Sequence, residues 1–457
     1  MSPSSTEPFA HSEQRAVASL ASLYATRMLG LFMVLPVMMV EGQKLAHATP
    51  ALLGLAMGVY GLTQALLQIP AGALSDRFGR KPVIITGLLI FALGSLIAAL
   101  SDSVYGVILG RALQGAGAIA SAIMALVTDL TREEHRMKAM ASIGASIGLS
   151  FSVALIAGPW LASIGGLESI FGLTAVLALL GVAVTIWVIP TPTARPHRDA
   201  SAVWPEVKKQ LSNRQLWPLN IGIFVLHALM VAIFVAIPLQ LINAGLSSQD
   251  HTWMYLPVLL LAFVLMVPFI IVAEKRRQMK SVVLFGAIAI VVSLMSMSVS
   301  SQLWHWALAL LVYFWGFNLM EASLPSWLSK VAPAGAKGSA MGIYSSMQFF
   351  GAFIGGSAGG LMLSAYGHIA LFVSLALLVL AWAVMVMKTP APKHLTSLRM
   401  TSTNALSDAQ LAELQALQGV AEVTWLADEA AIYLKISADE FDYSAAQIII
   451  NPAQASA

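Results

Sequence analysis

The sequence contains no cysteine and very few charged residues. Of its 457 residues only 10% are Asp, Glu, Lys or Arg, whereas 58% are hydrophobic, and the mean hydropathy is +0.80. Soluble domains carry about 25% charged residues, so a soluble enzyme of this length is excluded. The absence of cysteine excludes a disulfide framework, a thiolate metal site and a cysteine nucleophile. Most of the chain must therefore be solvated by lipid.

Long apolar runs fill the sequence instead. A helix that crosses the hydrocarbon core needs about 20 mostly apolar residues. Twelve such runs can be drawn, at residues 16–42, 50–73, 82–101, 104–129, 138–163, 168–189, 217–243, 252–273, 281–300, 304–329, 338–364 and 368–387. The first run is longer than a signal-peptide core, and residues 1–13 contain no Lys or Arg. It therefore predicts a mature span and not a cleaved leader.

The cations are distributed unequally between the two sides of these spans. Of the 25 Lys and Arg residues, 21 lie in the loops and tails of one side, whereas the loops of the other side contain only Lys44. Cytoplasmic loops carry the excess of Lys and Arg. The asymmetry predicts a multi-pass protein of the cell inner membrane with both termini in the cytoplasm. The net charge of +3 arises from these loops and does not indicate nucleic-acid binding.

Loop lengths predict the domain organisation. The longest internal loop separates six spans from six. We expect a cytoplasmic tail at 1–15, a six-helix half at 16–189, a cytoplasmic loop at 190–216, a second half at 217–390 and a cytoplasmic domain at 397–457. The charged loops that begin at Asp76 and Glu274 repeat with an offset of 198, from 76 to 274. Parallel repeats place a substrate path at their interface, near the bilayer midplane.

The loop after the second span contains the most specific motif, G-x-x-x-D-R-x-G-R-K. Its members are Gly72, Asp76, Arg77, Gly79, Arg80 and Lys81. Gly72 permits close approach of helices, and Gly79 permits a tight turn. Asp76 is an anion at a helix end, with cations one and four residues later. We interpret this motif as a latch between two rigid bodies, because the rule that places cations in the cytoplasm does not explain Asp76 or the glycines.

This motif resembles the first signature of the major facilitator superfamily, and the resemblance covers residues 14–390. Residues 111–117 resemble the family's span-4 signature, R-x-x-Q-G-x-G; they include Arg111, Gln114, Gly115 and Gly117. In the fifth span the glycines, with Gly158 and Pro159, resemble the signature of the drug:proton antiporter branch. The resemblance implies two six-helix halves, alternating access, and a helix-packing role for Gly115, Gly117, Gly158 and Pro159.

The family also pairs the loop motif with an acidic residue at the end of span 4 and with the start of span 11. Asp129 occupies the matching place in this sequence. The resemblance therefore implies a charge relay of Asp76, Arg77, Arg80 and Asp129 that holds the outward-facing state.

A narrower resemblance is to the YajR-type subgroup of the family. It rests on Arg27 and its neighbours to Pro36, on residues 316–325, and on His227 in the seventh span. Members of that subgroup continue past span 12 into a small cytoplasmic domain, as this chain does. The resemblance implies proton-driven export.

Two cationic side chains lie within predicted spans, where an ionisable group is costly unless it is paired or hydrated. Arg111, beside Gln114, is interpreted as an anion-binding group or as a cation that lowers the pKa of a nearby carboxylate. The alternative is a structural pair or a snorkelling side chain. For Arg27 a functional and a structural role stay equally open.

Two further ionisable side chains lie in the second half. Glu321, near Asn318, is a candidate proton carrier, because burial favours the neutral carboxyl group; alternatively it forms a fixed pair or caps the break before Pro325. His227 suits a proton relay, although a single His on an apolar helix is more often structural. We also expect spans 5 and 11 to pack against each other through small-residue stripes that include Gly148 and Gly356.

The tail after residue 397 is less hydrophobic than the spans. The pattern predicts a short strand at 398–400, a helix that begins with a capping box at Ser407–Gln410 and ends at Gly419, a hairpin of strands at 420–427 and 430–437, and a helix at 442–450. This βαββα order predicts a small ferredoxin-like module. Regulation, ligand binding or self-association through it is a hypothesis, and a passive stabilising role is the alternative.

The leading interpretation is a proton-coupled exporter of small amphipathic molecules or drugs. One alternative is a symporter or uniporter for a sugar or organic acid, with Arg111 as the anion clamp. Another, of a different class, is a membrane sensor that signals through the tail. The sequence contains no nucleophile–base pair, phosphate-binding glycine loop or metal-ligand cluster. We therefore expect no enzymatic activity, no cofactor and no metal; the expected partners are a small-molecule substrate, protons and the lipid bilayer.

Overall fold

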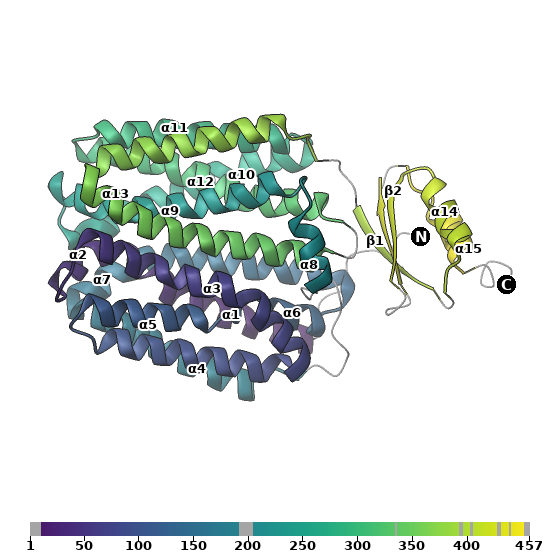
Figure 1. The fold of residues 1–457 in the computed structure, drawn as a ribbon, viewed down its shortest axis with the longest axis horizontal. Helices are drawn as coiled ribbons and strands as arrows, with labels where there is room; N and C mark the ends of the chain where they lie inside the picture. The colour runs from purple at the N-terminus through teal and green to yellow at the C-terminus, as the bar shows by residue number, and fades with distance from the viewer. Residues whose placement is uncertain are drawn as a thin grey trace.

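The computed structural model describes residues 11–191, 204–333, 336–392, 396–402, 405–426, 431–437 and 440–451. Long helices form a bundle, and a small sheet with two helices lies beyond one end of it (Figure 1). That end carries α8 (Trp204–Leu211) and is called the α8 end; the other end carries α2 (Met38–Glu41) and is called the opposite end.

The helices before α8 form what we call the N half. They are α1 (His11–Phe32), α2, η1 (Gly42–Lys44), α3 (Pro50–Phe78), α4 (Arg80–Ala99), α5 (Val104–Ala116), α6 (Ala120–Leu130) and α7 (Glu133–Trp187). Thr49 caps α3 by accepting a hydrogen bond from the Leu52 N–H, which satisfies one of the donors that a helix start leaves unpaired. Gly79, at φ +95°, ends α3 and lets α4 begin at the next residue.

The helices after α8 form the C half. They are α9 (Trp217–Asn243), η3 (Ser248–Asp250), α10 (His251–Lys275), α11 (Met279–Val299), α12 (Leu303–Val331) and α13 (Lys337–Lys388). Within the described residues, nine helical stretches are long and apolar enough to cross a membrane. Two of these contain a kink: the chain leaves the helical conformation at Gly165 and Gly166 in α7, and at Gly367 in α13.

Each predicted apolar run coincides with helical segments of the structure. The runs on either side of Gly165 share α7, and the runs on either side of Gly367 share α13. The first run is interrupted by turns at 33–37, around Pro36, and the fourth is interrupted at 117–119. Helix α8 was not predicted; it lies in the loop expected at 190–216. Residues 192–203 of that loop, and residues 1–10 of the predicted tail, lie outside the described residues.

Helices α3 and α13 approach each other closely enough to bring their backbones into contact. A Cβ atom added to Gly58 would lie 2.6 Å from the Phe353 carbonyl oxygen, and one added to Gly360 would lie 2.6 Å from the Pro50 carbonyl oxygen. Residue 50 begins α3 at the opposite end of the bundle. We call this contact the α3–α13 seam. It joins the N half to the C half.

The expected pairing of spans 5 and 11 was wrong. The glycines of α13 face α3 and also α9, where Gly351 and Gly355 lie against the backbone of Phe224 and Ala228. Gly148 of α7 instead faces the Phe263 ring of α10. A stripe of small residues shows that a helix can be approached closely, but it does not select the partner.

The C-terminal sheet has the predicted element order. It consists of β1 (Thr396–Thr401), α14 (Asp408–Ala416), β2 (Val420–Leu426), β3 (Ala431–Ile436) and α15 (Tyr443–Ile450). The strands lie in the order β1-β3-β2 and are antiparallel. The capping box at Ser407 and Gln410 is confirmed, and Gly419 has φ +81°. Helices α14 and α15 cover the face of the sheet that points away from the bundle (Figure 1). The expected turn at 428–429 lies outside the described residues.

Candidate functional site

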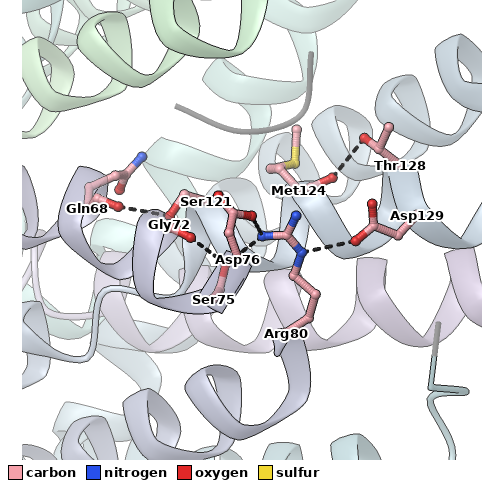
Figure 2. A network of polar contacts seen from close by, with 9 residues as sticks. All are labelled: Gln68, Gly72, Ser75, Asp76, Arg80, Ser121, Met124, Thr128 and Asp129. Atoms are coloured by element: carbon pink, nitrogen blue, oxygen red, sulfur yellow. Dashed lines mark hydrogen bonds and ion pairs between the residues drawn. The ribbon is translucent and has the colours of Figure 1, made fainter. Parts of the chain in front are cut away.

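A buried arginine joins two carboxylates at the α8 end of the N half. The Arg80 guanidinium pairs with Asp76 through Nη1 and donates from Nε to Asp129 Oδ2 at 3.0 Å (Figure 2). The side chains of Arg80 and Asp129 are each 3% exposed. We call these three residues the charge cluster. It joins the ends of α3 and α6 to the start of α4.

Local sequence explains why Arg80 reaches both acids. The turn at Gly79 makes Arg80 the first residue of α4, directly after α3 ends. Arg80 Nη1 also donates to Ser75 Oγ at 2.6 Å, and Ser75 donates to the Gly72 carbonyl at 2.7 Å. The sequence analysis missed Ser75, although its position one residue before Asp76 was a signal. A single turn thus supplies both the cation and the hydroxyl group that orients it.

The other two cations of the loop motif lie elsewhere. Arg77 is exposed, with its guanidinium 5.3 Å from the Phe78 ring centroid, so the structure does not bring it into the expected relay. Lys81 Nζ donates to the Ile189 carbonyl at 2.8 Å, at the end of α7. Cations near the last carbonyls of a helix are favourable. Lys81 therefore fastens the start of α4 to the end of α7.

The C half contains the counterpart of this contact. Lys280 Nζ donates to the Met387 and Thr389 carbonyls at 2.8 and 2.7 Å, at the end of α13. The end of α10 is joined to the end of α12 by an ion pair of 2.6 Å between Lys330 and Glu274, and Ser326 donates to the same carboxylate at 2.6 Å. The repeat of charged loops in the sequence thus corresponds to a repeat of contacts.

The predicted acid and histidine of the C half lie together. His227 Nδ1 of α9 lies 3.8 Å from Glu321 Oε2 of α12, and the Gln348 amide of α13 lies between them, with Nε2 2.7 Å from His227 Nε2 and 3.4 Å from Glu321 Oε1. Gln348 therefore links the imidazole to the carboxylate, whereas His227 Nδ1 and Glu321 Oε2 have no hydrogen-bond partner among the described residues. Sequence analysis missed Gln348, whose only signal was a polar residue within an apolar run.

The Glu321 side chain is partly accessible although its helix is long and apolar. It is 38% exposed, whereas the His227 side chain is 8% exposed. Nearby, the Asn318 Nδ2 and Tyr344 OH atoms are buried without a hydrogen-bond partner among the described residues. Unpaired buried polar atoms are costly. This cluster can therefore form further hydrogen bonds with a ligand, water or a rearranged neighbour, with Asn318 Nδ2 as a donor.

The two arginines within the N half have different surroundings. Arg111 is fully buried; it donates to the Ala56 carbonyl at 3.2 Å and to Gln114 Oε1 at 2.9 Å, and Gln114 donates to Ser95 Oγ at 2.7 Å. These contacts fit the structural alternative for Arg111 and Gln114. Arg27 donates to Gln64 Oε1 at 2.6 Å, but its Nε and Nη1 atoms have no partner within the described part of the chain.

Each glycine predicted to pack helices faces another segment. A Cβ atom at Gly72 would lie 3.2 Å from Ser121 Oγ, and Cβ atoms at Gly115, Gly117 and Gly158 would clash with backbone carbonyls of other segments. Pro159 lies inside α7 next to Gly158. In the described residues, no group of three or more His, Asp or Glu side chains is placed to hold a metal ion.

Comparison with known proteins decides the family. A model of the Major Facilitator Superfamily matches residues 16–356. The chain belongs to the major facilitator superfamily. It is 45% identical over 428 residues to the inner membrane transport protein YajR of Escherichia coli (strain K12), covering 93% of this chain and 94% of that protein. Members of this family are transporters, so the chain is not an enzyme.

More distant members show the same relationship. The chain is 25% identical over 336 residues to the multidrug resistance protein MdtH of Yersinia enterocolitica, covering 73% of this chain and 83% of that one. The crystal structure of a bacterial homologue of the human lysosomal transporter Spinster, in an inward-facing and occupied conformation, superposes with a TM-score of 0.69 at 13% identity, over 84% of this chain and 98% of that one. Its similarity concerns the fold.

Proposed function

We propose that this protein is an inner-membrane secondary transporter that exports small amphipathic molecules in exchange for protons, by alternating access. The observation that carries the proposal is Glu321, an acidic residue in the middle of a long apolar helix, accessible over part of its side chain and adjoining His227 and Gln348. The proposal also rests on the names of two relatives, an inner membrane transport protein and a multidrug resistance protein.

Glu321 supplies the coupling in this proposal. Its charged form is expensive in an apolar bundle, so it is stable only where water, His227 or a ligand donates to it. Proton binding removes that cost and favours closure of the helices around Glu321. A proton thus shifts the equilibrium between two conformations by its differential affinity for them.

The proposed topology has twelve spans. Dividing α7 at Gly165–Gly166 and α13 at Gly367 turns nine apolar stretches into eleven, and α1 with α2 forms the remaining one. An even number places both termini on one side, and the distribution of Lys and Arg assigns the α8 end to the cytoplasm. We propose that the C-terminal domain, with its βαββα order, is ferredoxin-like and cytoplasmic.

The charge cluster is proposed to act as the latch. Its contacts tie α3, α4 and α6 together at their α8 ends, so the N half moves there as one body. Buried ion pairs are strongly destabilised when one partner is removed. All three residues belong to the N half, so these contacts do not join the two halves as the sequence analysis expected of a latch. We propose that the cluster acts within the N half, by holding the α8 ends of its helices in the arrangement on which one of the two conformations depends. We expect Asp76→Asn and Arg80→Ala to abolish transport while membrane insertion is retained.

Proteoliposomes with an imposed pH gradient test the proposal. Candidate amphipathic compounds are first screened by efflux from cells, and proton flux is then measured with and without a compound that is exported. We expect compound-linked proton flux in the wild type and none in Glu321→Gln. Glu168→Gln, an exposed acid of α7, is the matched control and should behave as wild type. Transport without linked proton flux would overturn the coupling.

The alternatives receive less support from the contacts. A symporter or uniporter with Arg111 as an anion clamp requires donors that Arg111 already gives to α3 carbonyls and to Gln114. The same proteoliposomes separate antiport from symport by the direction of proton flux. A sensor that signals through the tail predicts that removal of residues 395–457 abolishes function, whereas a transporter retains its flux.

A further inference from the structure

A line of buried polar groups runs along α3 from the middle of the bundle to the charge cluster. Arg27 Nη2 donates to Gln64 Oε1 at 2.6 Å, and Gln64 Nε2 donates to Gln68 Oε1 at 2.7 Å. Arg27, Gln64 and Gln68 are each less than 5% exposed. Because an arginine only donates, it fixes the orientation of the Gln64 amide, and Gln64 in turn fixes that of Gln68.

The line continues through α6 and the loop motif. Ser121 Oγ of α6 donates to the main-chain carbonyl oxygen of Gln68, not to its side-chain amide, at 2.9 Å (Figure 2). This approach is possible because Gly72 has no side chain at the point where Ser121 lies. One turn later Ser75 accepts from Arg80, which binds Asp129 of the same α6. Helices α3 and α6 are thus fastened twice, at Gln68 and at Arg80.

Between these two points α3 lacks one of its backbone hydrogen bonds. Pro70 lies inside the helix, and a proline lacks the N–H group that would bond the carbonyl four residues earlier, so helices bend there. The pair Gln64–Gln68 lies before Pro70, and Ser75 lies after it. The part of α3 before Pro70 is therefore joined to α6 by the Gln68–Ser121 contact, and α6 in turn carries Asp129 of the charge cluster.

Arg27, where the line begins, has donors that its present contacts do not use. The Nε and Nη1 atoms of Arg27 are buried without a hydrogen-bond partner among the described residues, and its guanidinium lies 5.7 Å from the Phe91 ring centroid and 6.0 Å from that of Tyr60. A buried guanidinium with unmet donors gains free energy by moving to a new acceptor. When Arg27 moves, the Gln64 amide loses the contact that orients it.

We propose that Gln64 and Gln68 are positioning residues that connect Arg27 to the charge cluster, so that a change of partner at Arg27 alters the latch. The proposal rests on the proposed function, because it presumes that the charge cluster affects the balance between conformations. Neither glutamine needs to contact the transported molecule. They hold α3 and α6 in a fixed relative position while Arg27 donates to Gln64. When Arg27 moves to another acceptor, the two helices can shift relative to each other.

A thiol-labelling experiment tests the connection without a known substrate. The chain has no cysteine, so Ala51→Cys supplies a single thiol at the α3–α13 seam, where its Cα would lie 3.2 Å from a Cβ atom at Gly360. Its reaction rate with a water-soluble methanethiosulfonate reports separation of α3 from α13. The rate is measured for Arg27→Lys, for Asp129→Asn and for both together, in nanodiscs containing the full chain.

We expect each single variant to change the rate and the double variant to deviate from the product of the two effects by roughly threefold or more, within the range for residues of one network. With Gln64→Met and Gln68→Met present, the two effects should multiply. Gln114→Met, a buried glutamine of the same half that bonds Arg111 and Ser95, should leave the deviation intact.

Two results would contradict the proposal in different ways. A deviation that persists in the Gln64→Met, Gln68→Met background would overturn the connection alone. An Asp129→Asn rate equal to wild type would overturn the latch, and the connection with it. If the Met variants aggregate, Gln68→Asn, which keeps the amide but is too short to meet Gln64, provides the same comparison.

Discussion

Glu274 and Lys330 form an ion pair of 2.6 Å that joins the ends of α10 and α12, as Arg80 joins Asp76 to Asp129 in the N half. The two arrangements differ in charge and in burial. In the C half Lys330 is 18% exposed and Glu274 41%, whereas the side chains of Arg80 and Asp129 are each 3% exposed. The same two helix ends are thus held by a solvated pair in one repeat and by a buried arginine in the other.

This difference predicts unequal costs of substitution. Arg80→Ala leaves Asp129 buried without its cation, which costs about 3–5 kcal/mol, whereas exposed pairs contribute about 0–1 kcal/mol. We expect thermal unfolding in detergent to shift strongly downward for Arg80→Ala and little for Lys330→Ala. Equal shifts for the two variants would show that burial does not distinguish the repeats.

Lys81 and Lys280 should make matching contributions. Each caps the last carbonyls of the terminal helical segment of its half, α7 or α13, and a hydrogen bond from a charged donor contributes about 1.5–3 kcal/mol. We expect Lys81→Met and Lys280→Met to lower the unfolding temperature by similar amounts. Lys→Arg at either position keeps a donor and should recover most of the loss. A large effect at only one position would contradict the repeat of contacts.

The α3–α13 seam should not tolerate a branched side chain. Gly58→Val would force a Cβ atom against the Phe353 carbonyl, so the two helices must separate. We expect the labelling rate of Ala51→Cys to rise at least several-fold. Gly172→Val, at a helical glycine with open space around it, is the control and should leave the rate unchanged. An unchanged rate in Gly58→Val would show that α3 and α13 are not in contact there in the membrane.

The C-terminal domain should be held to the bundle by Lys435. This β3 side chain is 4% exposed, and its Nζ donates to the Lys330 carbonyl at 2.9 Å, near the end of α12. We expect Lys435→Ala to release the domain, seen as faster hydrogen exchange of the last turn of α12, while Lys435→Arg retains protection. Unaltered exchange in Lys435→Ala would assign the docking to other contacts.

The same contact should depend on pH. Burial lowers the pKa of Lys435, Lys337 lowers it further, and Glu422 opposes them. A lysine whose pKa is lower when docked binds fewer protons in that state, so docking strengthens as pH rises toward the ordinary value of about 10.4 and weakens as pH falls. Exchange at the end of α12 should therefore slow, relative to its intrinsic rate, as pH rises toward about 10.4, and Lys435→Ala should abolish that trend.

Sequence alone could predict the helices, because a run of about twenty apolar residues has few alternatives to a membrane span. Helix α8 was not predicted, because eight residues of mixed polarity are too few to show a helical periodicity. The contact of Asp76 with Arg80 was predictable from the motif, because the turn at Gly79 leaves Arg80 few directions. The part of Asp129 was implied only by the resemblance to the major facilitator superfamily.

The partners of the other site residues could not be predicted, because they depend on how each helix is rotated about its axis. One sequence does not say whether Arg111 points at a cavity or at the carbonyls of α3, so its structural contacts could not be distinguished from an anion site. Gln348 is similar: a polar residue in an apolar run has many possible partners, and only the packing of three helices brings it between His227 and Glu321. Sequence alone also does not say that α13 packs against α3 and α9, because this too depends on which way its glycines face.

The close contact at the α3–α13 seam limits how water can enter between the two helices. Its facing atoms at Gly58 and Gly360 are main-chain atoms of helices, whose polar groups are already satisfied along their own helix. Their N–H groups are not free to donate to water, and the two glycines have no side chains that could rotate away to admit it. At these glycines water can thus enter only when the two helices part.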